Sequence, residues 1–141
     1  GGWDGLEDEL LVETSMVVVA APDLIGGHDT SDVSRLGELP WLEEVGTSES
    51  SRWLQSHGAI DGMRGPLTQV PGNLMLDGAR DGQGVAVTVR TFVEADIQAG
   101  RLLVLHEDAT AGAGYHLVTR MGVHRPALRS FLRWIRKAAK R

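Results

Sequence analysis

Hydroxyl, amide and guanidinium side chains stand at three places where a helix is expected to begin. These places are Thr47-Ser48, Asn73 and Arg90-Thr91, each of which follows a predicted strand or loop. The first backbone N–H groups of a helix have no partner within it, and the helix dipole favours negative charge there. Arg90 adds a guanidinium that can bind a carboxylate through two hydrogen bonds. We predict that such helix starts contact a small ligand, with ordinary helix capping as the open alternative at each of them.

Residues suited to catalysis are present, but their spacing does not fit an active site. Three serines between 48 and 51 are followed by His57, yet no Gly-x-Ser-x-Gly nucleophile motif occurs, and a helix N-terminus accounts for the serines. Glu43 and Glu44 are adjacent, which places them on opposite sides of a predicted strand and is poor geometry for shared acid–base chemistry. The sequence therefore predicts a binding domain rather than an enzyme.

A metal or nucleotide cofactor is not expected either. No two histidines have the i, i+4 spacing of a helical metal motif, and no carboxylate is expected in ligand register beside one. Gly82-Gln83-Gly84 joins a predicted helix to a predicted strand, the reverse of the order in a dinucleotide-binding loop. The absence of cysteine excludes thiolate ligands and disulfide bonds. The five histidines are His28, His57, His106, His116 and His124.

The order of the predicted elements indicates an α/β domain, because strands alternate with helices. The stretch 58–72, with four glycines and two prolines, is expected to be mainly irregular or hairpin-like. Runs of valine and other strand-forming residues predict strands at 10–21 (one or two), 41–45, 85–89, 102–105 and 115–119. Apolar periodicity and glycine or proline stops predict helices at 31–39, 49–57, 73–80, 91–100 and from 126 onward.

The helix ends are predicted from capping residues. Thr30 or Ser31 is expected to cap the first helix, and Asn73 the third. The segment 91–94 reads Thr-Phe-Val-Glu, which fits a capping box. Pro126 is expected at the first position of the last helix, whose apolar residues recur at i, i+3, i+4 and i+7 and predict a face packed on an apolar surface. These apolar residues are Leu128, Phe131, Leu132 and Ile135.

The composition is that of an ordinary globular domain with an uneven distribution of charge. Of the 141 residues, 42% are hydrophobic and 23% are charged, and the formal net charge is −5. All 19 acidic residues lie between Asp4 and Asp108, whereas eight of the 14 basic residues lie between Arg120 and Arg141. The acidic remainder would repel a phosphate backbone, so we interpret the basic end as a solvated helix face. No secretory signal is visible, and no apolar run reaches the ~20 residues that a membrane helix needs.

Several short motifs follow one another in an order that is more specific than any of them alone. The strongest is Leu76–Val87, which reads Leu-Asp-Gly-Ala-Arg-Asp-Gly-Gln-Gly-Val-Ala-Val and continues to Gly100-Arg101-Leu102. The others are Gly2–Leu6, Glu9–Leu11, Val17–Leu24, Leu39–Leu42, Tyr115–Val118, and the set Phe131, Trp134 and Ile135. Together they resemble the effector-binding domain of LysR-type transcriptional regulators, and most closely its glycine-cleavage-activator branch.

The resemblance implies an α/β fold like that of type II periplasmic binding proteins. Such a fold has two lobes, a hinge where the chain crosses between them, and an effector in the cleft. In that frame, residues 1–13 and 110–141 form an incomplete lobe one, and residues 14–109 form lobe two. The family's N-terminal winged helix-turn-helix and the first stretch of lobe one lie outside this sequence, so DNA binding is expected only through a domain that is not included here.

The resemblance also implies partners and a site. Tyr115 joins Thr47, Ser48, Arg90 and Thr91 as an expected effector contact. The effector is expected to be a small anion or an amino acid, and neither a cofactor nor a metal is expected. The regulator as a whole is expected to be a cytoplasmic homodimer or homotetramer. The alternative is a solute-binding protein of a transport system with the same fold class, and an enzyme on this fold is a more distant possibility.

Overall fold

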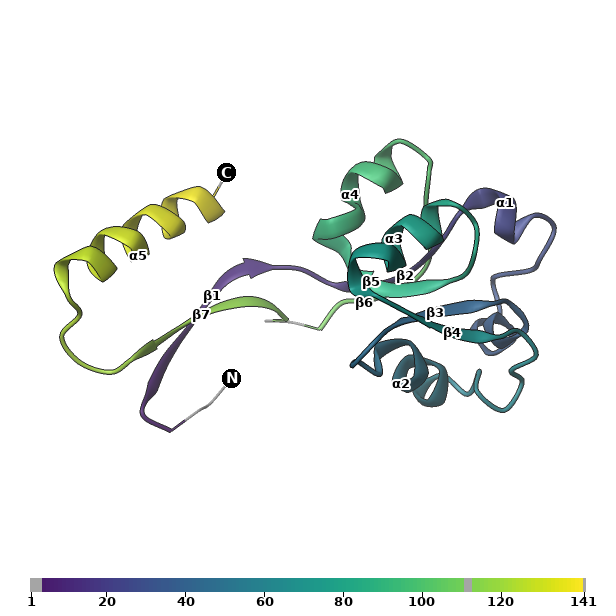
Figure 1. The fold of residues 1–141 in the computed structure, drawn as a ribbon, viewed down its shortest axis with the longest axis horizontal. Coiled ribbons are helices and arrows are strands. Elements are labelled where there is room, and N and C mark those ends of the chain that lie inside the picture. The colour runs from purple at the N-terminus through teal and green to yellow at the C-terminus, as the bar shows by residue number, and fades with distance from the viewer. Residues whose placement is uncertain (1–3, 111–112, 141) are drawn as a thin grey trace. The chain divides into compact units, whose positions relative to one another are not determined.

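The chain forms two compact units, each of which has its own strands and helices. A computed structural model describes residues 4–110 and 113–140 (Figure 1). The larger unit is Ser15–Asp108, and the smaller unit combines Gly1–Thr14 with Ala109–Arg141. Gly2-Trp3 of the first motif and Arg141 of the basic end lie outside the described residues.

The larger unit is built on strands that mostly run in one direction. β2 lies between β5 and β6 and is antiparallel to both, whereas β3 and β4 are paired in parallel. A parallel bridge between Trp41 and Val85 links β3 to β5. It follows that β3, β4, β5 and β6 share one direction and only β2 opposes them. The strands of this unit are β2 (Met16–Ala20), β3 (Trp41–Glu44), β4 (Leu67–Val70), β5 (Ala86–Val89) and β6 (Leu103–Asp108).

Helices cover both faces of these strands, which explains why β2 is apolar at every position. Val18 packs in one cluster with Trp41 and Leu54 of α2, while Val17 and Val19 pack in another with residues of α3 and α4. A strand that is buried on both faces needs no polar alternation. The helices are α1 (Pro22–Ile25), a 3-10 helix (Val33–Glu38), α2 (Glu49–Ser56), α3 (Gly72–Arg80) and α4 (Arg90–Gln98). No helix in the described part of the chain has the length and apolarity needed to cross a membrane.

The smaller unit has little core of its own. It consists of β1 (Leu6–Glu13) paired antiparallel with β7 (Gly114–Arg120), followed by α5 (Pro126–Ala139). Leu132 is the only buried hydrophobic residue among the described residues of this unit. The prediction that the apolar face of α5 packs on an apolar surface therefore holds for Leu132 and partly for Ile135, but not for Leu128 and Phe131. The exposed large hydrophobic residues of the unit are Leu6, Leu10, Tyr115, Val118, Met121, Val123, Leu128, Phe131 and Trp134.

The predicted caps of the first helix and the third are wrong. Asp32, rather than Thr30 or Ser31, accepts a hydrogen bond from a backbone N–H of the 3-10 helix, at 3.0 Å from Ser34. α3 begins one residue before Asn73, directly after a proline and without a side-chain cap. Pro71 occupies the N-cap position, and its side chain has no oxygen that could accept a hydrogen bond from the first turn.

The predicted capping box at 91–94 is also wrong, because α4 starts earlier. β5 runs directly into α4: Val89 is still paired with Met16, and Arg90 is already the first helical residue. The N–H of Arg90 donates to the carbonyl oxygen of Ser15 at 2.9 Å. The N-cap position is therefore occupied by Val89, the last residue of β5, whose apolar side chain cannot accept a hydrogen bond. The stretch 58–72 is mainly irregular, as predicted, but it also contains a short strand, β4, which pairs in parallel with β3.

Candidate functional site

Three helices of the larger unit begin at one edge of its strands. β3, β4 and β5 are parallel neighbours, so their carboxyl ends lie at the same edge, and α2, α3 and α4 follow them there. The chain also enters and leaves the unit at this edge, because Met16 at the start of β2 pairs with Val89 and with Asp108. We call it the carboxyl edge. In open α/β sheets, ligands bind at such edges.

At the start of α2, the carboxylate of Glu43 accepts a backbone hydrogen bond that a bound anion could otherwise accept. Ser48 is the N-cap residue of α2 and makes no side-chain cap, while Thr47 donates its hydroxyl to the carbonyl of Glu44 at 3.1 Å. The backbone N–H of Ser51 donates to Oε1 of Glu43 at 2.9 Å, and Glu43 is buried. The start of α2 therefore has one donor fewer for a ligand than its sequence suggests.

The second helix start is likewise occupied by a carboxylate. A Cβ atom at Gly72, the first residue of α3, would lie 2.1 Å from Oε1 of Glu44. The carboxylate thus rests against the first turn of α3, where the helix dipole favours it. A side chain at this position would require the carboxylate of Glu44 to move. Asn73 is the exposed second residue of α3.

The third helix start carries the only predicted cation of the site. The guanidinium of Arg90 donates to Glu94 at 2.9 Å and to Glu107 at 2.8 Å, and Ser15 also bonds to Glu107. Arg90 therefore ties α4 to β6, and a ligand carboxylate would have to join or displace these partners. Thr91, the next residue, lies exposed at the same helix start.

Tyr115 belongs to the smaller unit, where it lies on β7 opposite Val12. Its side chain is exposed. The five predicted contacts are thus divided between the units: Thr47, Ser48, Arg90 and Thr91 share the carboxyl edge, and Tyr115 lies on the other unit.

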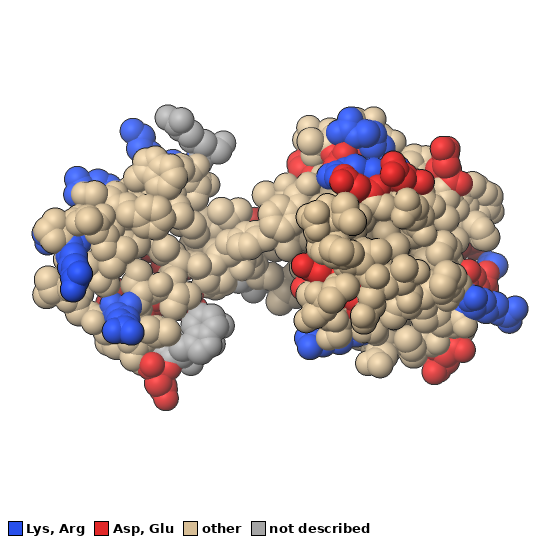
Figure 2. All heavy atoms as spheres, in the orientation of Figure 1, with Lys and Arg blue, Asp and Glu red and all other residues tan. Residues whose placement is uncertain are grey.

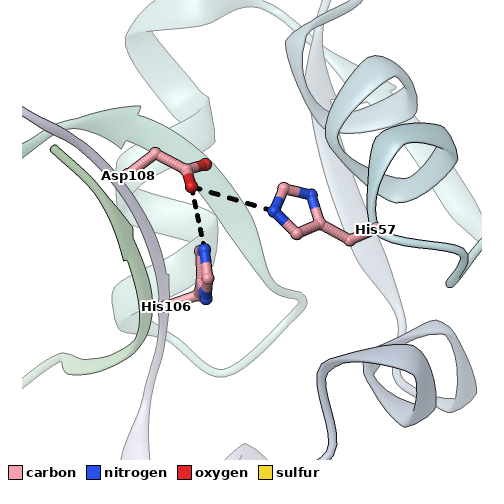
Figure 3. A group of neighbouring side chains, drawn as sticks. All are labelled: His57, His106 and Asp108. Carbon is pink, nitrogen blue, oxygen red and sulfur yellow. Dashed lines mark hydrogen bonds and ion pairs between the residues drawn. The ribbon is translucent and has the colours of Figure 1, made fainter. Parts of the chain in front are cut away.

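A second group, which the sequence analysis missed, is formed by His57, His106 and Asp108 (Figure 3). Nε2 of His106 lies 2.9 Å from Oδ1 of Asp108, and Nε2 of His57 lies 3.8 Å from the same oxygen. The expectation that no carboxylate stands in register beside a histidine is therefore wrong. Residues two apart in a strand share a face, and this spacing in β6 was the available signal. Nothing in the sequence places His57, at the end of α2, beside them.

The fold matches that of solved regulatory domains from several bacteria. The effector domain of AmpR from Pseudomonas aeruginosa superposes with a TM-score of 0.69 at 21% identity, over 99% of this chain and 67% of that one. The CrgA regulatory domain from Neisseria meningitidis gives a TM-score of 0.72 at 19% identity, over 99% and 72% of the two chains. Residues 2–140 match the family described as LysR substrate binding domain. The chain belongs to this family.

Among curated relatives of this LysR domain is the AhcY transcriptional activator HvrB of Rhodobacter capsulatus. It is 30% identical over 139 residues, which are 99% of this chain and 48% of HvrB. The chain therefore spans about half the length of this relative. The α/β fold and the role of effector-binding domain predicted from the sequence are confirmed. LysR-type regulators are not enzymes, and these matches favour a regulator over a transport protein. None of them singles out the glycine-cleavage-activator branch.

Proposed function

We propose that this LysR domain binds its small-molecule effector at the carboxyl edge of the larger unit. The observation that carries the proposal is the common origin of α2, α3 and α4 at the edge where the chain enters and leaves the unit. The proposed contacts are Thr47, Ser48, Arg90 and Thr91 from this unit and Tyr115 from the smaller one.

The two units are proposed to be the two lobes of a periplasmic-binding-protein-like fold. Residues 14–109 would form lobe two, and residues 1–13 with 110–141 would form part of lobe one. The scarcity of buried hydrophobic residues in the smaller unit supports an incomplete lobe. So does the match to only 67% of the AmpR effector domain by 99% of this chain.

The regulator that contains this domain is proposed to bind DNA through a winged helix-turn-helix outside this chain. We place it in the cytoplasm, as a homodimer or homotetramer, in the glycine-cleavage-activator branch. Its effector would be an amino acid or a small anion; the LysG regulator of Corynebacterium glutamicum, which is 18% identical, was solved with bound effector Arg. The effector would favour one arrangement of the lobes and so shift the population of DNA-binding states.

A thermal-shift screen of the full-length regulator against amino acids, small carboxylates and cell-wall fragments tests this proposal. An effector at ~100 times its dissociation constant adds about 2.7 kcal/mol to the free energy of unfolding, which raises the melting temperature. A regulator that binds its operator but is not stabilised by any compound of these classes would contradict small-molecule sensing.

The role of Arg90 is tested by substitution. We expect R90A to weaken effector binding at least ~10-fold in isothermal titration, because a charge-assisted contact contributes about 1.5–3 kcal/mol. E94Q is the matched control, since it removes one ion pair of Arg90 but keeps the guanidinium. Unchanged affinity in R90A, or an equal loss in E94Q, would remove Arg90 from the site.

A further inference from the structure

We propose that His57, His106 and Asp108 form a binding site for a divalent transition-metal ion of the Zn²⁺ class. The three side chains each offer one ligand atom, and these atoms all lie within 4.8 Å of one another (Figure 3). Zn–N and Zn–O bonds of 2.0–2.2 Å in a tetrahedral site separate the ligand atoms by about 3.4 Å. The distances of 2.9 and 3.8 Å to Oδ1 of Asp108 lie on either side of this value. Small rotations of the side chains would therefore bring the ligand atoms to the spacing that the ion requires.

The hydrogen bonds of His57 leave its Nε2 available as a ligand. Nδ1 of His57 lies 3.0 Å from the carbonyl oxygen of Trp53, which can only accept, and 2.9 Å from Oγ of Ser56. The Ser56 hydroxyl itself donates to that carbonyl oxygen at 3.0 Å, so both contacts favour a proton on Nδ1. The lone pair of a neutral imidazole is then on Nε2, which points toward Asp108 in Figure 3. Metal-binding histidines are commonly held in this way, with the second nitrogen donating to a backbone carbonyl.

The carboxylate of Asp108 is oriented as well. The indole N–H of Trp53 donates to Oδ2 at 3.1 Å, which leaves Oδ1 facing the two imidazoles. His57 Nε2 and a carboxylate oxygen are both acceptors, so they attract each other only through a shared proton or cation. A metal ion would replace the proton that now joins His106 to Asp108.

The site rests on a rigid aromatic support. The ring of Trp53 stacks on that of His57 with centroids 4.2 Å apart, and Trp53 stacks in turn on the fully buried Trp41 at 5.4 Å. A fixed support limits the ordering cost of binding. The side chains of the three ligands are 25%, 27% and 42% exposed, so water can complete the coordination. Two imidazoles and one carboxylate, without a thiolate, suit Zn²⁺, Co²⁺ or Ni²⁺ better than Mg²⁺ or Ca²⁺.

Metal titration of the protein, expressed without a polyhistidine tag and stripped with a chelator, tests this site. The wild type is expected to bind Zn²⁺ in competition with a chromophoric chelator, and H57Q, H106Q and D108N are each expected to weaken binding at least 10-fold. H116Q is the matched control, because His116 also pairs with an aspartate, at 2.6 Å from Asp8, but belongs to no cluster of three ligands in the described residues. H116Q should bind Zn²⁺ like the wild type.

Co²⁺ gives an independent readout that does not depend on stability. The wild type should show the intense visible absorption of four-coordinate Co²⁺, and folded H106Q should lose it. Absence of wild-type binding would overturn the proposal, as would binding that survives all three substitutions or is lost equally in H116Q. The three ligands include none of the proposed effector contacts, and the two proposals are tested with different variants and different titrants, so either can fail while the other stands.

Discussion

At the scale of single residues, Asp96 of α4 is a buried carboxylate that forms ion pairs with two arginines. It is only 5% exposed, and it accepts hydrogen bonds from Arg80 at 2.9 Å and from Arg101 at 2.8 Å. These bonds connect the end of α3 with α4 and with the turn before β6. The hydrogen bonds from Arg80, more than those from Arg101, hold the pKa of Asp96 below its ordinary value of 3.8, although burial opposes this.

We expect D96N to lower the free energy of unfolding by about 2 kcal/mol, because charge-assisted hydrogen bonds are lost in a buried place. Urea denaturation of both proteins measures the difference. D77N is the matched control: Asp77 pairs with the same Arg80 at 2.7 Å, but its side chain is 64% exposed. The control should lose less than about 1 kcal/mol. Equal losses in the two variants would show that the burial of Asp96 is unimportant.

The lowered pKa of Asp96 predicts how the stability of the protein depends on pH. A carboxyl whose pKa is lowered by folding stabilises the protein above its unfolded pKa, and this contribution is lost as the pH falls through the folded pKa. The difference in stability between wild type and D96N should therefore be constant from neutral pH to about pH 5 and shrink below pH 4. Unfolding measured at several pH values checks this. A difference that grows on acidification would contradict the assignment.

At the scale of elements, glycines fix how closely the 3-10 helix approaches the segment after α2. A Cβ atom at Gly37 would lie 2.2 Å from the carbonyl oxygen of Ala59, and backbone cannot move aside as a side chain can. Gly62 lies nearby, but a Cβ there would be 3.7 Å from its nearest neighbour, the carbonyl oxygen of Ser34. A methyl group at Gly37 would therefore clash with the backbone, whereas one at Gly62 would not.

We expect G37A to lower the free energy of unfolding by about 3 kcal/mol, as overpacking against backbone does. G62A, the matched control, should stay within about 0.5 kcal/mol of the wild type or be slightly more stable, because it stiffens the unfolded chain. Thermal denaturation of both variants is the measurement. A G37A protein as stable as G62A would mean that the 3-10 helix shifts freely.

At the scale of the whole molecule, the two units differ in how much they bury and in charge. Nearly all buried hydrophobic residues belong to the larger unit. Figure 2 shows basic side chains around the unit with α5, and acidic and basic side chains next to each other on the larger unit. The smaller unit exposes Phe131 and Trp134, whose rings contact each other with centroids 5.7 Å apart. We expect the rest of the proposed lobe one, which would lie outside this chain, to cover this apolar surface.

Hydrogen exchange tests this expectation. In the 141-residue chain, the amides of β2 and β5 should exchange slowly, and those of β1, β7 and α5 much faster, because local stability follows buried apolar contacts. In the full-length regulator, the amides of α5 should become protected. Slow exchange of α5 in the short chain, or no gain in the full-length protein, would contradict an incomplete lobe one.

The sequence by itself determined the class of fold, the order of most elements and the family, because these depend on local periodicity and on motifs in succession. The valine-rich stretch 10–21 predicted one or two strands, and Pro126 predicted the start of the last helix, as the structure has them. The tertiary structure decided what depends on partners distant in sequence. β4 exists because β3 lies beside it, Glu43 and Glu44 occupy the helix starts, and His57 reaches Asp108 because α2 packs against the face of β6 that carries His106. The sequence on either side of each of these residues contains no motif that would predict such contacts.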